Sequence, residues 1–204
     1  MTRSRGRSPA APTDPPPQAD DARIQGALYR IAEAAASATD MPDFYARIHR
    51  AVGELMDARN FYVALYDAER GAINFPYSVD SVETEIPDPA AWTTFGSGSA
   101  RGLTGYILRT GEPALITQQR YEELIAAGEI DRVGADGEDW LGVPLRWNDE
   151  TIGVVVVQTY EAGANYSQED VTVLTFVAGH IASALTRARP ISLTSASSDR
   201  KSVV

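Results

Sequence analysis

Cysteine is absent from all 204 residues of the sequence. Without a thiol, the chain cannot form a disulfide, supply a thiolate to a metal, use a cysteine nucleophile or link a chromophore through a thioether. Long apolar runs are also missing: none approaches the roughly 18 residues that a membrane helix needs, and the N-terminus lacks the apolar segment of a signal peptide. We therefore expect a cytoplasmic protein with no membrane insertion.

Basic residues are outnumbered, because 18 Lys and Arg stand against 28 Asp and Glu and give a formal net charge of −10. This balance opposes electrostatic binding to nucleic acid or to an anionic membrane surface. Hydrophobic residues make up 44% of the chain, an ordinary content for a globular protein with a real core. The length suits one domain with extensions.

Both ends of the chain lack the pattern of a folded segment. Residues 1–20 carry five prolines and almost no large apolar side chain, so we predict a disordered, proline-rich leader there. Residues 190–204 predict an unstructured tail. The last six, DRKSVV at 199–204, resemble the translation of a sequencing-library adaptor. Two interpretations stay open: a gene product truncated before its continuation, and a genuine short tail.

Four consecutive valines, Val154 to Val157, lie at the centre of the pattern. Because alternate residues of a strand point to opposite faces, four valines in a row predict a strand that is covered on both sides. We predict this strand over Thr151–Tyr160 and a partner strand over Trp140–Trp147. The turn at Asn148–Glu150 joins them, since Asn and Asp tolerate the left-handed backbone of tight hairpins.

Three further strands follow from composition. Aromatic and β-branched residues predict strands over Asn60–Asp67 and Ala72–Val79, and a short one over Ala114–Thr117. Pro76 cannot donate a hydrogen bond to a ladder, so the strand Ala72–Val79 is predicted at an edge of the sheet.

The segment between Asp80 and Glu138 shows no regular pattern, so we predict a long irregular connection there. It contains two short predicted helices, over Leu103–Thr110 and Gln119–Ala127. Its apolar residues argue against disorder, so we expect it to form a lid over one face of the sheet.

Three longer helices are predicted to cover the other face. They span Asp21–Ala38, about Pro42 to Asp57, and Gln168–Arg189. The chain from 21 to 189 therefore predicts one α+β domain. An antiparallel sheet of five to six strands would have N- and C-terminal helices on one face, and loops and short helices as a lid on the other.

The last predicted helix carries two signals. Ser167 and Asp170 have the spacing of a capping box at its start. Five apolar residues follow a heptad a/d spacing that is typical of a coiled-coil seam: Val171, Leu174, Ala178, Ile181 and Leu185. A second apolar flank is predicted to cover the sheet: Val173, Phe176 and Val177.

Six segments, taken in order, resemble a GAF domain over about Ala22 to Arg189. They are NFYVALYD, FPYSVD, GLTGYILRTGEPALI, DWLGVPL, IGVVVVQTY and YSQEDVTVLTFVAGHIASAL. The resemblance is to the type that precedes output domains in bacterial signalling proteins such as diguanylate cyclases and sensor histidine kinases. It implies an antiparallel sheet with a small-molecule pocket under the lid. It also implies a last helix that pairs in a homodimer and continues into a covalently linked output domain.

Several family cofactors are not expected. Members that bind cyclic nucleotides carry an Asn-Lys pair where this chain has Thr159-Tyr160, and a Glu where it has Val171. Bilin-binding and methionine-sulfoxide-reducing members use Cys. The two histidines, His49 and His180, are predicted on helices away from the lid, which disfavours a haem or zinc site. We therefore expect no cofactor and no metal.

A pocket under the lid would use aromatic residues with a few polar groups, an arrangement suited to a planar metabolite. The candidate ligand-binding residues are Tyr62, Tyr66, Tyr106, Arg109 and Trp140, with Arg109 available for an anion. The alternative is that these side chains only fill the core.

The chain shows no Ser/His/Asp set and no nucleophile turn, so we do not expect an enzyme. The expected function is that of a sensory module that binds a small molecule and signals through its terminal helices to an output domain, in two-component or cyclic-di-GMP signalling. The alternative is a ligand-free domain that serves only as a dimerisation spacer.

Overall fold

The computed structural model of the chain describes residues 17–95, 99–133, 137–161, 163 and 165–188. Most of the predicted leader, residues 1–16, and the predicted tail from 190 lie outside these residues. Residues 17–20, which were assigned to the leader, instead form the first turn of a helix that begins at Pro17. Proline suits this position, because a first-turn residue needs no backbone N–H donor.

The described residues form five α-helices and six strands. The helices are α1 (Pro17–Ser37), α2 (Met41–Gly53), α3 (Leu103–Thr110), α4 (Gln118–Ala126) and α5 (Gln168–Ala188), with a 3₁₀ turn at Ser99–Arg101. The strands are β1 (Asn60–Asp67), β2 (Ala72–Val79), β3 (Trp92–Thr94), β4 (Ala114–Thr117), β5 (Asp139–Trp147) and β6 (Glu150–Thr159). They make one antiparallel sheet in the order β3-β2-β1-β6-β5-β4. The predicted α+β class with five to six strands is confirmed.

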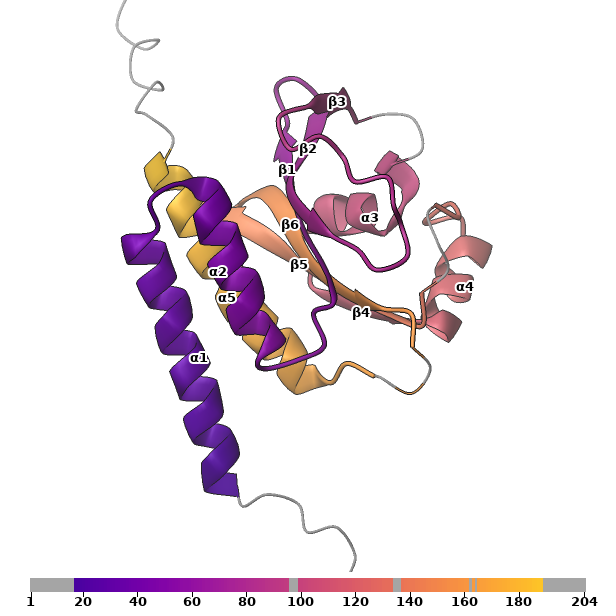
Figure 1. The fold of residues 1–204 in the computed structure, drawn as a ribbon. Helices are drawn as coiled ribbons and strands as arrows, with labels where there is room; N and C mark the ends of the chain where they lie inside the picture. The colour runs from indigo at the N-terminus through magenta and orange to yellow at the C-terminus, as the bar shows by residue number, and fades with distance from the viewer. Residues whose placement is uncertain (1–16, 96–98, 134–136, 162, 164, 189–204) are drawn as a thin grey trace, which may run out of the picture.

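The sheet lies between two layers (Figure 1). On one face, α2 and α5 pack against the strands, and α1 packs on these two helices from outside. On the other face lie α3 and α4 with their connecting loops. None of the helices in the described ranges combines the length and the apolar content needed to cross a bilayer.

Strand β6 is covered on both faces. Val155 and Val157 belong to the apolar core under α2 and α5, whereas Val154 and Val156 belong to a second apolar cluster under the lid. All four side chains are 0% exposed. Full burial of a valine side chain is worth roughly 1.5–3 kcal/mol, so this strand links the two cores energetically as well as in space. The two-sided burial predicted from the valine run is confirmed.

The seam residues predicted on α5 lie largely in the protein's own core. Leu174, Ala178 and Ile181 are buried against the sheet and neighbouring helices, and Val171 and Leu185 pack partly against the same core. The apolar stripe is therefore explained by packing within one chain. A dimer contact cannot use the three buried side chains in this conformation.

The second flank of α5 is divided between core and surface. Val177 is buried in the core and Val173 is also buried, but Phe176 is 43% exposed and packs against His180 in a tilted arrangement with 4.6 Å between ring centroids. The prediction that all three cover the sheet was therefore wrong for Phe176. Its ring lies on the outward side of a helix that turns by about 100° per residue, one position before the buried Val177.

The strand β2 is not an edge along its whole length. The three-residue strand β3, which was not predicted, pairs with residues 72–74 and lies outside it. Pro76 lies beyond this pairing, at an irregularity where the register with β1 shifts between Val63 and Leu65. A bulge tolerates a missing N–H donor as an edge does, so the edge prediction was wrong although its physical reason applies locally.

The capping and turn signals appear as local geometry. Ser167 and Asp170 form the predicted capping box, with the Ser167 N–H donating to Asp170 Oδ2 (2.7 Å) and the Asp170 N–H donating to Ser167 Oγ (3.3 Å). The central hairpin turns on only two residues, Asn148 and Asp149, whose φ angles are 48° and 67°. Glu150, predicted in the turn, already pairs with the partner strand.

Gly153 offers a direct test of the close packing around β6. A Cβ at this position would lie 2.3 Å from the backbone oxygen of Ala64 on β1. That oxygen cannot move without disturbing the sheet, so we expect Gly153→Ala to lower the free energy of unfolding by about 1–3 kcal/mol. Equilibrium urea unfolding measures the change.

Gly53, near the end of α2, provides the matched control, because an added Cβ there meets nothing within 4 Å. Gly53→Ala should leave stability unchanged or raise it by up to about 1 kcal/mol. Equal unfolding midpoints for the two variants would contradict the packing described for β6.

Candidate functional site

A cavity of about 250 Å³ lies under the lid, on the face of the sheet opposite α2 and α5. Its wall comes from strands β1, β2, β4, β5 and β6, the loop after β2 and the segments around α3 and α4. Its lining residues are Tyr62, Phe75, Ser78, Asp80, Glu83, Glu85, Ile86, Pro87, Gly102, Leu103, Thr104, Ile116, Thr117, Tyr121, Val133, Gly137, Trp140, Gln158 and Tyr160.

Two aromatic side chains hold each other in place at the sheet side of the cavity. The indole Nε1 of Trp140 donates to the hydroxyl of Tyr62 (3.3 Å), and this hydroxyl shares a 2.9 Å hydrogen bond with Thr104 Oγ1. The Trp140 ring lies over Gly142, where an added Cβ would approach the ring to 2.1 Å. The glycine in the strand therefore makes room for the indole.

The Tyr62 phenol is poorly solvated. Burial, the main cause, raises its pKa to about 12, and the nearby carboxylates of Glu83 and Asp80 add to the shift. The hydrogen bonds with Thr104 and Trp140 act in the opposite direction. Tyr62 is therefore a neutral hydrogen-bonding group at physiological pH and not a base.

Asp80 carries a fixed carboxylate on the other side of the cavity. Its Oδ1 accepts from the N–H groups of Val82 and Glu83, both at 2.8 Å. Its Oδ2 accepts from Gln158 Nε2 (2.8 Å) and from the Tyr160 hydroxyl (3.0 Å). Four donors therefore hold this carboxylate in one orientation.

The pKa of Tyr160 reflects the negative charge in this part of the cavity wall. Burial raises the pKa of its phenol, and the hydrogen bond to Asp80 and the charges of Asp80 and Glu83 raise it further. All of these causes keep the proton on the phenol. The wall therefore combines neutral hydroxyl groups with negative charge.

The structure brings together two of the five predicted ligand-binding residues, Tyr62 and Trp140. Tyr66 instead packs edge-on against Phe95, with 5.1 Å between ring centroids. Tyr106 packs against the apolar cluster under the lid and is not among the residues that line the cavity.

The side chain of Arg109 forms hydrogen bonds within the lid and does not face the cavity. Its Nη1 donates to the backbone oxygen of Ala100 (2.5 Å), and its Nη2 donates to that of Glu129 (2.7 Å). Both contacts join α3 to loops of the lid. The anion-binding role expected from the sequence has no geometric basis in these contacts.

Some cavity residues were not predicted from the sequence, although a strand pattern in the sequence places them on the lid face. Gln158 and Tyr160 continue the alternation of Val154 and Val156, so period-two counting places them on the lid face. Ser78 lies opposite Tyr62 in the β1–β2 register. The acidic residues of the loop after β2 gave no such signal, because loop conformation follows no sequence period.

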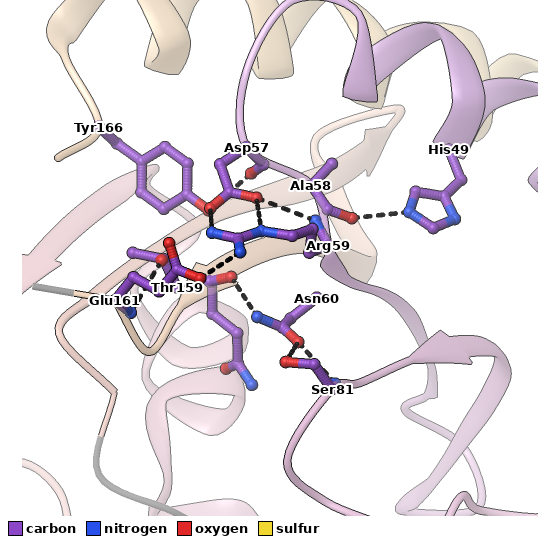
Figure 2. A network of polar contacts seen from close by, with 10 residues as sticks. His49, Asp57, Ala58, Arg59, Asn60, Ser81, Thr159, Glu161 and Tyr166 are labelled. Atoms are coloured by element: carbon purple, nitrogen blue, oxygen red, sulfur yellow. Dashed lines mark hydrogen bonds and ion pairs between the residues drawn. The ribbon is translucent and has the colours of Figure 1, made fainter. Parts of the chain in front are cut away.

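A polar network joins the cavity rim to the strand ends (Figure 2). Ser81, next to Asp80 in the chain, donates from its N–H and from its Oγ to Asn60 Oδ1, both at 2.7 Å. Asn60 Nδ2 then donates to the backbone oxygen of Gln158 (2.9 Å). These bonds tie the loop after β2 to the start of β1 and the end of β6.

The same network reaches the entry of α5. Arg59 pairs with Asp57 (2.7 Å) and with Glu161, and the Tyr166 hydroxyl donates to the backbone oxygen of Asp57 (2.8 Å). The Tyr166 N–H donates to Asp139 Oδ2 (3.2 Å). Hydrogen bonding to Arg59 lowers the pKa of Asp57, whereas burial raises the pKa of Tyr166.

The two histidines lie on the helical side of the sheet. His49 stacks on Phe61, and its ring nitrogens bond to the backbone oxygen of Ala58 (2.7 Å) and the Tyr77 hydroxyl (2.9 Å). His180 lies on α5, where burial lowers its pKa. Within the described residues, no three His, Cys, Asp or Glu side chains are grouped to hold a metal ion.

A second hollow, beside α1 and α2, is lined largely by charged residues and is a weaker candidate. Its Arg30 pairs with Glu54, and its Arg47 pairs with Asp43. Exposed pairs of this kind are an ordinary feature of a helical surface.

Tyr62 predicts an alkaline stability change. Its folded-state pKa is raised from an ordinary 10.0 to about 12, so its contribution to stability is fully present below pH 10 and is lost as the pH rises through 12. We expect Tyr62→Phe to make this loss shallower, by at most about 1.4 kcal/mol per pH unit, which is the limit for one proton. Urea unfolding at a series of pH values measures the slope.

Tyr29→Phe controls for the loss of one phenol, because this ring is 70% exposed on α1. The slopes of the wild type and Tyr62→Phe are compared across the same pH range. Identical slopes would contradict the buried environment assigned to Tyr62.

Comparison with known proteins agrees with this architecture. A family model described as GAF domain matches residues 38–186. No curated protein matches the chain.

Solved structures share the fold at low sequence identity. The GAF domain of an Acinetobacter phosphoenolpyruvate-protein phosphotransferase is 17% identical, with a TM-score of 0.64 over 80% of this chain and 93% of that one. The GAF domain of the Coxiella burnetii phosphoenolpyruvate-protein phosphotransferase is 16% identical, with a TM-score of 0.65 over 82% and 95%. Free methionine-R-sulfoxide reductase from Neisseria meningitidis, solved with its substrate, is 17% identical, with a TM-score of 0.59 over 87% and 95%.

The family model spans most of the chain, including every strand and the larger part of α5. At this level of identity, the structural neighbours are evidence for the fold alone. Together with an antiparallel sheet that is covered on both faces, the family match leads to one conclusion: this chain belongs to the GAF domain family.

Proposed function

We propose that this GAF domain is a non-catalytic sensory module of the cytoplasm that binds a small molecule in the cavity under the lid. Binding would shift the packing of the terminal helices and pass that change to a covalently linked output domain of the diguanylate cyclase or histidine kinase type. The single observation that carries the proposal is a cavity of about 250 Å³ lined by aromatic and polar side chains.

The composition of the cavity supports binding over catalysis. Tyr62 and Tyr160 both keep their protons at neutral pH, because burial raises their pKa values. Asp80 has donors on both oxygens and is positioned as a fixed charge. A general base would need a free acceptor near its substrate, and these three groups are already hydrogen-bonded.

The polar network supports a route from the cavity to α5. Asp80 lines the cavity, and its neighbour Ser81 bonds to Asn60 at the start of β1. Asp57, three residues before Asn60, accepts a hydrogen bond from the hydroxyl of Tyr166 at the entry of α5. A ligand that moves the loop after β2 would bias these contacts, provided that it binds two arrangements with different affinity.

Dimerisation belongs to the same proposal, with a changed contact surface. Because Leu174, Ala178 and Ile181 lie in the chain's own core, a homodimer would use the outward side of α5, where Phe176 is exposed. The N-terminal helix α1 packs beside α5 and would take part in any rearrangement.

The alternative function is a ligand-free dimerisation spacer. One observation favours it: in the described residues, no buried side-chain nitrogen or oxygen lacks a hydrogen-bond partner. The Tyr62 and Trp140 pair is an example of this mutual satisfaction. The two functions differ in whether the cavity is occupied in the purified protein.

Native mass spectrometry of the freshly purified protein separates the two functions. We expect a dimer mass and an additional small-molecule mass that is lost on collisional activation. In Ser78→Phe, the added ring points from β2 into the cavity opposite Tyr62, so we expect the small-molecule mass to fall at least tenfold in occupancy.

Val79→Phe adds the same bulk at the next position of β2, which faces the other side of the sheet and is 37% exposed. This control should retain the small-molecule mass. A wild-type protein that is free of any bound small molecule, or one that keeps it in Ser78→Phe, would contradict binding in this cavity.

A further inference from the structure

The charged lining residues that the structure describes are all of one sign. They are the carboxylates Asp80, Glu83 and Glu85, and none of the described lining residues is Arg, Lys or His. An anionic ligand would meet repulsion at this wall, whereas a cation would be attracted to it.

The charge of Asp80 is held in place without being neutralised. Its four donors are two backbone N–H groups, the Gln158 amide and the Tyr160 hydroxyl, and all four are uncharged. The charges of Glu83 and Asp80 also raise the pKa of Tyr62, another residue of the lining, although burial is the main cause.

Two basic side chains beside the lid, Arg101 and Arg132, have acidic partners. Arg132 lies 5.7 Å from the centroid of the Tyr121 ring and donates to both carboxylate oxygens of Glu122, at 2.8 and 3.0 Å. Arg101 donates to Asp131 (2.7 Å). Arg101 and Arg132 are therefore each paired with a carboxylate outside the cavity lining.

Aromatic rings provide the complementary surface for a cation. The lining contains Tyr62, Phe75, Tyr121, Trp140 and Tyr160. Ring faces attract organic cations, and the attraction grows when the site is desolvated. A flat ligand could therefore contact the rings while its charge lies towards the carboxylates.

A metal ion fits this wall poorly. Within the described residues, no three carboxylate or histidine side chains lie close enough together to ligate one. Both carboxylate oxygens of Asp80, which a hard cation such as Ca²⁺ or Mg²⁺ would need as ligands, already accept two hydrogen bonds each. An organic cation satisfies both the rings and the charge.

We propose that the cavity selects an organic cation with a flat aromatic ring, such as a protonated arylalkylamine, over neutral or anionic molecules of similar shape. This inference rests on the proposed sensory function and adds the chemical class of the ligand. The carboxylates of Glu83 and Glu85 attract the charge at the rim, and Asp80 supplies a fixed charge inside it.

Three indole probes of similar size and different charge test the selection: tryptamine, tryptophol and indole-3-acetate. Isothermal titration calorimetry with the full chain should show tryptamine binding about tenfold more tightly than tryptophol, and indole-3-acetate binding more weakly than either. Raising the salt concentration should reduce the preference for tryptamine.

Substitutions that remove a negative charge test which carboxylates attract the cation. Glu83→Gln/Glu85→Gln should weaken tryptamine binding about threefold to tenfold and leave tryptophol binding within about twofold. Glu112→Gln/Glu150→Gln, which removes two exposed carboxylates outside the cavity lining, is the matched control and should leave both affinities unchanged.

Equal binding of tryptamine and tryptophol, or preference for indole-3-acetate, overturns the cation inference and leaves small-molecule binding standing. Binding of Ca²⁺ alone with the same dependence on Glu83 and Glu85 also overturns it in favour of a metal site. If none of the three probes binds at millimolar concentration, the inference fails. The sensory function fails with it only when native mass spectrometry also shows no bound small molecule.

Discussion

The two-sided burial of β6 is the constraint on which the rest of the molecule depends. Val155 and Val157 join the core under the terminal helices, while Val154 and Val156 join the cluster under the lid. A strand of this kind cannot be left uncovered on either face without exposing a row of valines to water. The helices and the lid are therefore both obligatory parts of one fold, although the segments that form them are far apart in the sequence.

The candidate site follows from the lid face of this strand. After Val156, the same face continues through Gln158 to Tyr160, where the apolar cluster gives way to hydrogen-bonding groups and to Asp80. The cavity thus lies where the sheet stops being fully apolar. The backbone oxygen of Gln158 also belongs to the network that reaches Tyr166 on the way into α5. A ligand at this place would touch both the loop after β2 and the end of β6, the strand that precedes α5 in the chain.

Local patterns in the sequence were enough to predict five of the six strands, the central hairpin and the capping box of α5. Alternation predicted the faces of β1 and β6, and the Ser167–Asp170 spacing predicted the start of α5. The heptad on α5 shows where such patterns stop being informative. An apolar stripe predicts that something covers that side of the helix. It does not distinguish a partner chain from the chain's own sheet. Here Leu174 and Ile181 pack in the chain's own core.

The site was harder to predict than the fold because its parts meet through loops. Tyr62 and Trp140 could be placed from strand faces, whereas Arg109 turned out to bond two backbone oxygens of the lid. A long side chain on a short helix can reach in many directions, and the sequence does not state which carbonyl oxygens lie near it. The acidic residues after β2 could not be placed from the sequence either, since only the folded loop brings them to the cavity.

Native-state hydrogen exchange is the most direct test of the central claim. If β6 is sealed by both layers, the amides of Val154 to Val157 should exchange only through global unfolding, and those of the lid helix α3 should exchange through smaller, local openings. Denaturant dependence separates the two kinds of opening. Exchange of the four valine amides through openings as small as those of α3 would contradict a sheet that is held from both sides.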